Sequence, residues 1–270
     1  MRKNRIPKTI VIVLLCCIQL IPLYITAMVS VRPQTDLTSY WKLPVTPYFR
    51  NFTTAFEAGN LLRAFTNTFI ITVTATLAVL LLAMMAAYPL ARYPSRFNRA
   101  VRTFFLSIMM IPALSLLVPI YVLLLRLGGI SKYQGIVPVH VAFNLPLAIY
   151  MISNFIKTIP SELDEAALID GCSVYSIFYR IIVPMLKPVI VSVIILTAVP
   201  VWNDYQYSVY FMQKPQMRVI TLAVASFFQQ SGSDPHVAAA AALMVIIPVV
   251  VLFIFLQKYF IKGMVDGAIK

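Results

Sequence analysis

The sequence predicts an all-α integral membrane protein with six transmembrane helices, several of them kinked, and one polar internal loop. Its 270 residues are 60% hydrophobic and 11% charged, with a mean hydropathy of +0.86. That composition leaves too little polar surface to cover a water-soluble globule. Five uncharged runs are long enough to cross a bilayer as helices, and a sixth is interrupted by one acid. The runs lack the two-residue alternation of a membrane β-barrel, so helices are expected.

The first span follows a basic N-terminal segment, residues 1–9, which is expected in the cytoplasm. The apolar run after it is longer than the roughly 7–15-residue core of a signal peptide, and no small-x-small cleavage site closes it cleanly. We therefore expect an uncleaved first transmembrane helix.

The whole transmembrane domain is expected over residues 10–262, with a polar loop at 158–187 and a tail at 263–270. Prolines recur inside the apolar runs, and each removes a backbone hydrogen bond and permits a kink. This favours a bundle that changes shape, although proline is in any case commoner in membrane helices than in soluble ones. The expected spans are about 10–31, 64–91, 103–125, 135–156, 188–210 and 237–258.

Lysine and arginine predict the orientation. Basic residues cluster before the first span and, without any acid, in the loop 92–102 after the second span. The positive-inside rule then places both termini and the loop 158–187 in the cytoplasm. The net charge of +13 is thus a topology signal. It is not a nucleic-acid-binding patch, so no nucleic-acid partner is expected.

The sequence lacks the residue patterns that several other functional classes require. No GxxxxGK[ST] pattern occurs, so the chain has no P-loop for ATP. His140, His236 and the three cysteines lack metal-ligand spacing, and no serine lies in a GxSxG context. We therefore expect no catalytic residue, no metal and no cofactor in this chain. An ion-coupled carrier needs ionisable groups within its spans, and only Asp204 among nine acids falls there.

The loop 158–187 predicts two short helices around a glycine turn. Pro160 ends the preceding span, and Ser161 with Asp164 resembles a capping box that starts the next helix. Gly171 is placed to end that helix in a left-handed conformation, and a second short helix, SVYSIFYRII, follows.

The first of these helices carries small residues at helical spacing: Leu163, Ala166, Ala167 and Asp170. Such a face is slim enough to enter a cleft on another protein, where Glu165 and Asp170 can pair with basic groups. A solvated helix at the membrane surface is an equally good interpretation of the same pattern.

The stretch EAALIDGCSVYSIFYRIIVPMLKP, residues 165–188, resembles the EAA loop of permease subunits of bacterial ABC importers. Cys172 and Val183 depart mildly from the usual alanine and leucine. Residues 67–93 resemble the second span of that family and its exit. The tripeptide at 202–204 and the ending GMVDGAIK resemble its carbohydrate branch, the maltose, trehalose and glycerol-phosphate type. The likeness is to the shorter of its two sister permeases. The matching loop residues are Glu165, Ala166, Ala167, Asp170, Gly171, Phe178, Ile181, Pro184 and Pro188.

This resemblance implies a fold like that of a type I ABC importer and a non-catalytic role in a bacterial cytoplasmic membrane. Its partners would be a sister permease, two P-loop ATPase subunits that bind ATP and magnesium, and an extracytoplasmic solute-binding protein. The short helix would be a coupling helix for the ATPase. The resemblance implies alternating-access transport of a sugar, with a di- or oligosaccharide expected. The ATPase-coupling residues would be Glu165, Ala166, Ala167, Asp170 and Gly171.

Two further sets of residues have a candidate role and an alternative one. The segment Lys214–Asp234 is a candidate contact for the solute-binding protein, or a plain surface loop. Polar and aromatic residues within the spans are candidates for the sugar pathway, because polar groups there normally face the bundle interior. Asn144 and Asn203 fit equally well as ties between neighbouring helices, and the sister subunit is an alternative source of most sugar contacts. The pathway candidates are Asn67, Asn144, Trp202, Asn203 and Asp204.

Two other classes of function remain as alternatives. An ion-coupled secondary transporter would use Asp204 as its coupling site. A membrane enzyme or assembly factor would need a catalytic constellation, which the sequence does not contain.

Overall fold

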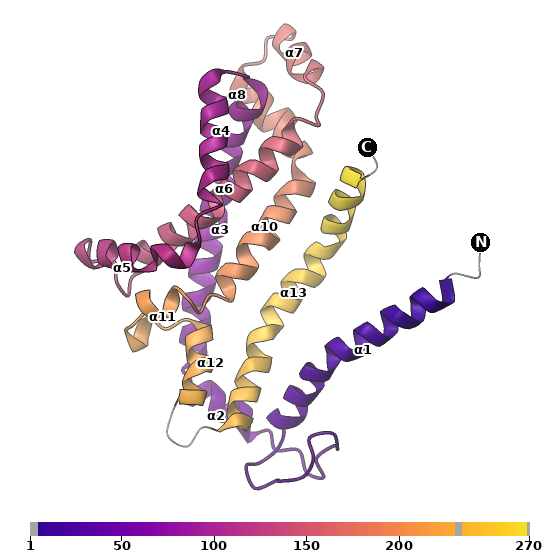
Figure 1. The fold of residues 1–270 in the computed structure, drawn as a ribbon, viewed down its shortest axis with the longest axis vertical. Coiled ribbons are helices and arrows are strands. Elements are labelled where there is room, and N and C mark those ends of the chain that lie inside the picture. The colour runs from indigo at the N-terminus through magenta and orange to yellow at the C-terminus, as the bar shows by residue number, and fades with distance from the viewer. Residues whose placement is uncertain (1–4, 230–233, 269–270) are drawn as a thin grey trace. The chain divides into compact units, whose positions relative to one another are not determined.

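The computed structural model describes residues 5–229 and 234–268, and every regular element within them is a helix. Figure 1 labels most of these helices, which are numbered in chain order. The chain divides into two compact units, and each is described by itself. Unit 1 comprises residues 1–65 and 220–248, and unit 2 comprises residues 66–219 and 249–270.

Unit 1 is built around small side chains. Its elements are α1 (Arg5–Ser30), α2 (Arg50–Ala58), the start of α3 (Leu61–Arg92), α12 (Ile220–Gln229) and the start of α13 (Pro235–Ala268). Ala238, Ala240 and Ala241 of α13 are completely buried, and such small side chains allow close helix contact. By contrast, the flank of α1 stays open, with large side chains from Ile10 to Leu20 more than half exposed.

Unit 2 holds most of α3 and the polar internal loop. Its first helices are α4 (Arg96–Ile108), η1 (Ala113–Leu116), α5 (Leu117–Arg126) and α6 (Tyr133–Ile156). The loop then contributes α7 (Glu162–Ile169), α8 (Val174–Ile177), the π-helical turn η2 (Phe178–Ile182) and α9 (Val183–Met185). The unit continues with α10 (Lys187–Trp202), α11 (Ser208–Phe211), η3 (Pro215–Met217) and the end of α13.

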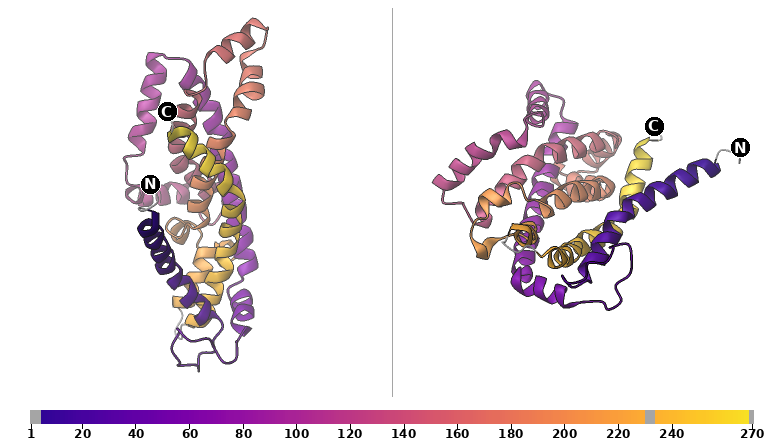
Figure 2. Two further views of the ribbon diagram at one scale, coloured as in Figure 1. Left: turned by 90° about the vertical axis from the view of Figure 1, so that its right-hand side faces the viewer. Right: turned by 60° about the horizontal axis from the view of Figure 1, so that its bottom comes forward.

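The core of unit 2 joins three segments that are distant in the sequence. Alanines of α3 lie at 0% exposure against isoleucines of α6 and against the chain from α8 to α10. Small residues on one helix let a neighbouring backbone approach closely. Both views in Figure 2 show α3, α6 and α10 side by side. The core includes Ala83, Ala87, Ile149, Ile152, Ile156, Ile177, Ile182, Leu186 and Val193.

Among the described residues, four helices are long and apolar enough to cross a membrane alone. The number of candidate spans rises to six if each of two bent pairs forms one span. The span expected over about 103–125 is sharply bent, because α4 and the segment 113–126 meet at an angle of 91°. Pro112 explains the break: it is extended, with ψ of 120°, and the residue before a proline avoids helical geometry. The second bent pair, 174–185 with 187–202, turns by 73° just before Pro188.

One expected span end also differs from the structure. The helix expected over 188–210 ends at Trp202, after which a turn leads to α11. The last span is expected over about 237–258; the membrane-length apolar stretch of α13 is Pro235–Phe255, and its helical backbone continues to Ala268. Hydropathy marks where lipid-compatible residues stop, whereas backbone hydrogen bonding decides where a helix stops.

Candidate functional site

The helix α7 forms a small projecting element at one end of unit 2, beyond the ends of α6 and α10 (Figure 1). Gly171 ends it with φ of +81°, and the N–H groups of Gly171 and Cys172 donate to the carbonyls of Leu168 and Ala167 at 3.0 and 2.9 Å. This pair of bonds is the Schellman arrangement, in which the left-handed residue favours glycine. The left-handed helix end predicted at Gly171 is confirmed.

The predicted capping box at the start of α7 is wrong. Ser161 has helical backbone angles, and its side chain makes no capping hydrogen bond. Instead its carbonyl oxygen accepts from the backbone N–H groups of Asp164 and Glu165, so the chain already turns helically at Ser161. A capping side chain needs extended backbone at the cap position.

The buried side of α7 includes one residue of the expected docking face. Ala167 is 6% exposed and packs into the core cluster, and Asp164 is 9% exposed. Of the four residues of the expected docking face, Ala167 turns inward, whereas Leu163, Ala166 and Asp170 stay exposed. The side chains left in the open are Glu165, Ala166, Asp170, Leu168 and, at 87% exposure, Ile169.

Asp164 makes the contact that explains this orientation. Its Oδ2 lies 2.5 Å from Nε of Arg92, the last residue of α3, and both side chains are close to nine-tenths buried. One terminal nitrogen of Arg92 donates to the carbonyl of Ile159 at 2.9 Å, and the other donates to that of Pro160 at 3.4 Å. The guanidinium of Arg92 therefore binds both the residues that precede α7 and a side chain of α7 itself. Sequence reasoning missed this pair, although an acid beside the EAA residues and an arginine that ends a span were visible signals.

The chain after Gly171 also contacts the end of α3. Ser173 caps α8 by accepting from the N–H of Ser176 at 3.3 Å. The ring of Phe178 then packs against that of Tyr88 in α3, with ring centroids 5.3 Å apart. The π-helical turn η2 starts at Phe178, and such turns often mark functional positions in helices.

Asn67, a candidate for the sugar pathway, is buried at 4% exposure, and both the nitrogen and the oxygen of its side-chain amide are hydrogen-bonded. Its Nδ2 donates to the carbonyls of Gln216 and Arg218 at 3.0 and 2.8 Å, and its Oδ1 accepts from the Tyr133 hydroxyl at 2.6 Å. An asparagine amide has two N–H donors, so both are used here. This favours a structural role for Asn67 over sugar binding.

Asn144 and Asn203 each bond within their own helical segment. Asn144 donates to the carbonyl of His140, and Asn203 donates to that of Val199, at 2.8 and 3.0 Å. Neither of these bonds ties neighbouring helices. Asn203 is exposed, whereas Asn144 is partly buried.

Asp204 starts the short helix α11. Its carboxylate accepts from the N–H of Tyr207 at 3.1 Å and from the N–H and hydroxyl of Ser208 at 2.9 and 2.7 Å. His140 approaches from α6, with Nε2 at 3.7 Å from Asp204 Oδ2. Trp202, just before the turn, is 6% exposed. The structure therefore brings Asp204 to a buried histidine that sequence reasoning left as a packed residue.

A groove between α6 and α10, lined by apolar and some polar side chains, was also missed. It measures about 330 Å³, within the roughly 300–1,000 Å³ range of ligand pockets. Asn154, one of its lining residues, accepts a 3.4 Å hydrogen bond from Arg102. Spaced polar residues in both spans were the available signal. The lining residues are Met151, Asn154, Phe155, Thr158, Pro188, Val189 and Ser192.

Within residues 5–229 and 234–268, no three His, Cys, Asp or Glu side chains lie close enough to hold a metal ion. The candidate contact segment Lys214–Asp234 contains η3 and the helix α12, so it is largely structured. Its residues 230–233 lie outside the described residues.

Known proteins resemble this chain over nearly its full length. Residues 79–266 match the family described as binding-protein-dependent transport system inner membrane component. The melibiose/raffinose/stachyose import permease protein MelC of Bacillus subtilis is 40% identical over 263 residues, which cover 97% of this chain and 95% of that protein. The probable starch degradation products transport system permease protein AmyC of Thermoanaerobacterium thermosulfurigenes is 30% identical over 274 residues, all of both chains.

A solved structure supports the same fold. A crystal structure of a bacterial ABC transporter involved in the import of the acidic polysaccharide alginate contains a chain that matches with a TM-score of 0.80. The match covers 96% of this chain and 98% of that one, at 23% identity. At this identity the likeness establishes the arrangement of helices.

Proposed function

The chain belongs to the family of binding-protein-dependent transport system inner membrane components, and from that premise we propose how its own residues couple transport to a separate ATPase. It is a membrane permease subunit of a carbohydrate ABC importer, as its full-length relatives indicate. Those relatives are transport permeases, so the subunit is non-catalytic. ATP and magnesium bind on two partner P-loop ATPase subunits.

The exposed side of α7 is the contact for the ATPase. Ile169, at 87% exposure, is the main apolar side chain there, with Leu168 beside it and Glu165 able to pair with a basic group. Burying one such isoleucine contributes about 1.5–3 kcal/mol to docking. Ala166 and Asp170 complete this face, and Gly171 sets its end.

Contacts on the buried side of α7 transmit the movement of α7 to the membrane-spanning helices. Because the Arg92–Asp164 pair and the Phe178–Tyr88 contact both join the loop to the end of α3, a displaced α7 pulls α3 with it. Packed interiors transmit strain because they compress little. ATP-driven closure of the ATPase pair would then switch the spans between inward- and outward-facing states.

The orientation has both termini and α7 in the cytoplasm of a bacterium, by the positive-inside rule. The loops 31–49 and 214–234 then lie outside, where a solute-binding protein delivers sugar. A sister permease completes the translocation path. Within this subunit, the groove between α6 and α10 is a better candidate for sugar contact than Asn67, whose amide is already engaged.

The substrate is a di- or oligosaccharide. Relatives are named for melibiose, raffinose and stachyose, for starch degradation products and for maltodextrin. An ion-coupled carrier is not favoured, because Asp204 is engaged by three hydrogen bonds at the start of α11.

The observation that carries the coupling proposal is the exposed apolar tip of α7 above a buried ion pair. Ile169→Asn should abolish recovery of the ATPase with the purified permease and should uncouple ATP hydrolysis from sugar uptake. Leu127→Asn is the matched control, since Leu127 is similarly exposed, at 71%, but follows α5. Unchanged ATPase recovery with Ile169→Asn would contradict the proposal, as would sugar uptake that persists in ATP-depleted vesicles with an ion gradient intact.

A further inference from the structure

The loop between α1 and α2 has its polarity reversed relative to an ordinary surface loop. Arg32 is 0% exposed, while Leu37, Leu43 and Val45 are 94%, 74% and 99% exposed. Water favours the opposite arrangement, with the cation outside and the apolar side chains covered. Other large apolar side chains in the open are Tyr40, Trp41, Tyr48 and Phe49.

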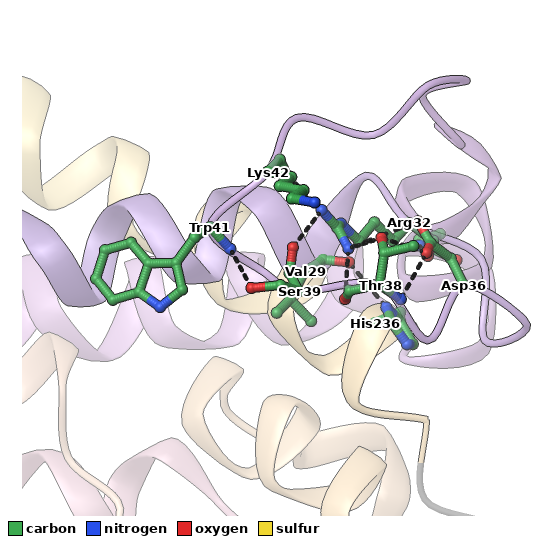
Figure 3. A network of polar contacts seen from close by, with 9 residues as sticks. Val29, Arg32, Asp36, Thr38, Ser39, Trp41, Lys42 and His236 are labelled. Carbon is green, nitrogen blue, oxygen red and sulfur yellow. Dashed lines mark hydrogen bonds and ion pairs between the residues drawn. The ribbon is translucent and has the colours of Figure 1, made fainter.

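Arg32 closes this loop by binding its backbone (Figure 3). One terminal nitrogen donates to the carbonyl and the hydroxyl of Thr38, at 2.8 and 2.7 Å, and lies 3.6 Å from Asp36. The other donates to the carbonyls of Ser39, at 3.0 Å, and of Lys42. The guanidinium thus organises the loop from within, and the outward apolar side chains are part of a built surface.

Trp41 sets the depth of the loop. The Tyr24 hydroxyl donates to the Trp41 carbonyl at 2.9 Å, and the two rings stack with centroids 6.3 Å apart. Tyr24 lies six residues before Ser30, where α1 ends, so the contact is about 9 Å back along the helix at 1.5 Å per residue. Figure 3 shows the Trp41 indole pointing away from the arginine cluster.

The loop therefore folds back alongside a membrane span. The apolar part of α1, Thr9–Ser30, has 22 residues, about 33 Å at 1.5 Å per residue, close to the roughly 30 Å hydrocarbon core. A contact about 9 Å from its end lies where interfacial helices bury their apolar faces, about 5–10 Å into the headgroup and acyl boundary. Tryptophan and tyrosine are enriched at this depth, and the neighbouring Lys42 can extend to lipid phosphates.

We propose that residues 33–49 are an interfacial anchor whose apolar side chains insert into the phospholipid headgroup region beside α1, with Arg32 as the internal clasp that holds the anchor in shape. The assignment to the outer leaflet rests on the orientation given under the proposed function, whereas insertion into lipid does not. The anchor holds the external end of α1 at a constant depth while other helices move.

The test is quenching of Trp41 fluorescence in the importer complex, reconstituted into phosphatidylcholine vesicles. Two otherwise identical complexes, with Trp41 and with Trp41→Phe, are compared, so that the difference reports Trp41 alone. We expect bromine near the glycerol backbone of the lipid to quench this signal more than bromine at the chain ends. Aqueous iodide should quench it little. Strong iodide quenching would mean a loop in water, and protection from both quenchers would mean a protein cover; either result overturns the anchor.

Arg32→Gln tests the clasp, with Arg50→Gln as its matched control. Both changes remove one positive charge from the same segment, but Arg50 is exposed. We expect only Arg32→Gln to reduce quenching by lipid bromine and increase quenching by iodide. Equal effects would overturn the role of Arg32, and the comparison of the unaltered loop with Trp41→Phe remains decisive if this variant does not fold. Failure here leaves ATPase recovery by α7 untouched, so the two proposals fail separately.

Discussion

Arg92 and Asp164 form a buried ion pair that joins the end of the span α3 to the short helix α7, with Nε and Oδ2 2.5 Å apart. The same arginine holds the two carbonyls that precede α7. A charged pair that loses one partner leaves an uncompensated charge in a desolvated place. The pair therefore specifies where α7 sits, and four measurements follow from this and from other contacts.

Removing Arg92 should destabilise the permease and loosen α7. We expect Arg92→Met to lower the free energy of unfolding by about 3 kcal/mol, the lower end for a broken buried pair because both side chains keep a little exposure. Thermal unfolding of the purified permease measures this. The double change Arg92→Met with Asp164→Leu should recover part of the loss.

Arg96→Met is the control for that experiment, since Arg96 begins α4 and is exposed. It should change stability by less than about 1 kcal/mol, as for most exposed charges. If Arg92→Met and Arg96→Met were equally mild, the pair would have no role in holding α7.

Gly171 should tolerate a side chain sterically but not conformationally. An added Cβ would meet nothing within 4 Å, so the whole cost of Gly171→Ala comes from its φ of +81°. We expect a loss of about 1–2 kcal/mol in unfolding free energy. Gly171→Asn should cost less, because asparagine adopts the left-handed conformation more readily. A larger loss for asparagine than for alanine would point to crowding in place of backbone strain.

Asn67 should behave as a structural residue. Asn67→Leu removes three hydrogen bonds and leaves the Tyr133 hydroxyl and two carbonyls without this partner, each worth about 1 kcal/mol. Stability should fall while the sugar concentration for half-maximal uptake stays the same. Tyr133→Phe, which removes one of these bonds, should show a smaller loss. A marked change in sugar affinity with normal stability would instead return Asn67 to the sugar pathway.

Asp36 should make the loop 31–49 sensitive to acid. Hydrogen bonds from the Thr38 hydroxyl and N–H lower the pKa of this carboxyl, and Arg32 lowers it further. Because the pKa in the folded protein is depressed, the stabilising contribution is present above the usual value of about 3.9 and is lost as pH falls through the lower folded pKa.

The measurement is iodide quenching of Trp41 against pH, which should rise only below about pH 4. Thr38→Val should shift this rise to higher pH, since the Thr38 hydroxyl is the largest cause of the depressed pKa. Asp36→Asn should flatten the profile. A rise that survives Asp36→Asn would assign the acid sensitivity to another group.

The sequence by itself determined the membrane class, most of the long spans and the turn at Gly171. Each of these depends on local properties: the hydropathy of a run of about 20 residues, or the backbone freedom of one glycine. The EAA loop was found in the same way, because its pattern is contiguous in the chain.

Only the tertiary structure decided which side of α7 is buried, and that Asp164 binds Arg92 from a different helix. It also decided that Arg32 lies inside its loop while Leu43 and Val45 lie outside. Helical spacing shows which residues share a face, but the direction of that face depends on the packing partner. A charge moves inside only where the folded chain supplies its hydrogen bonds.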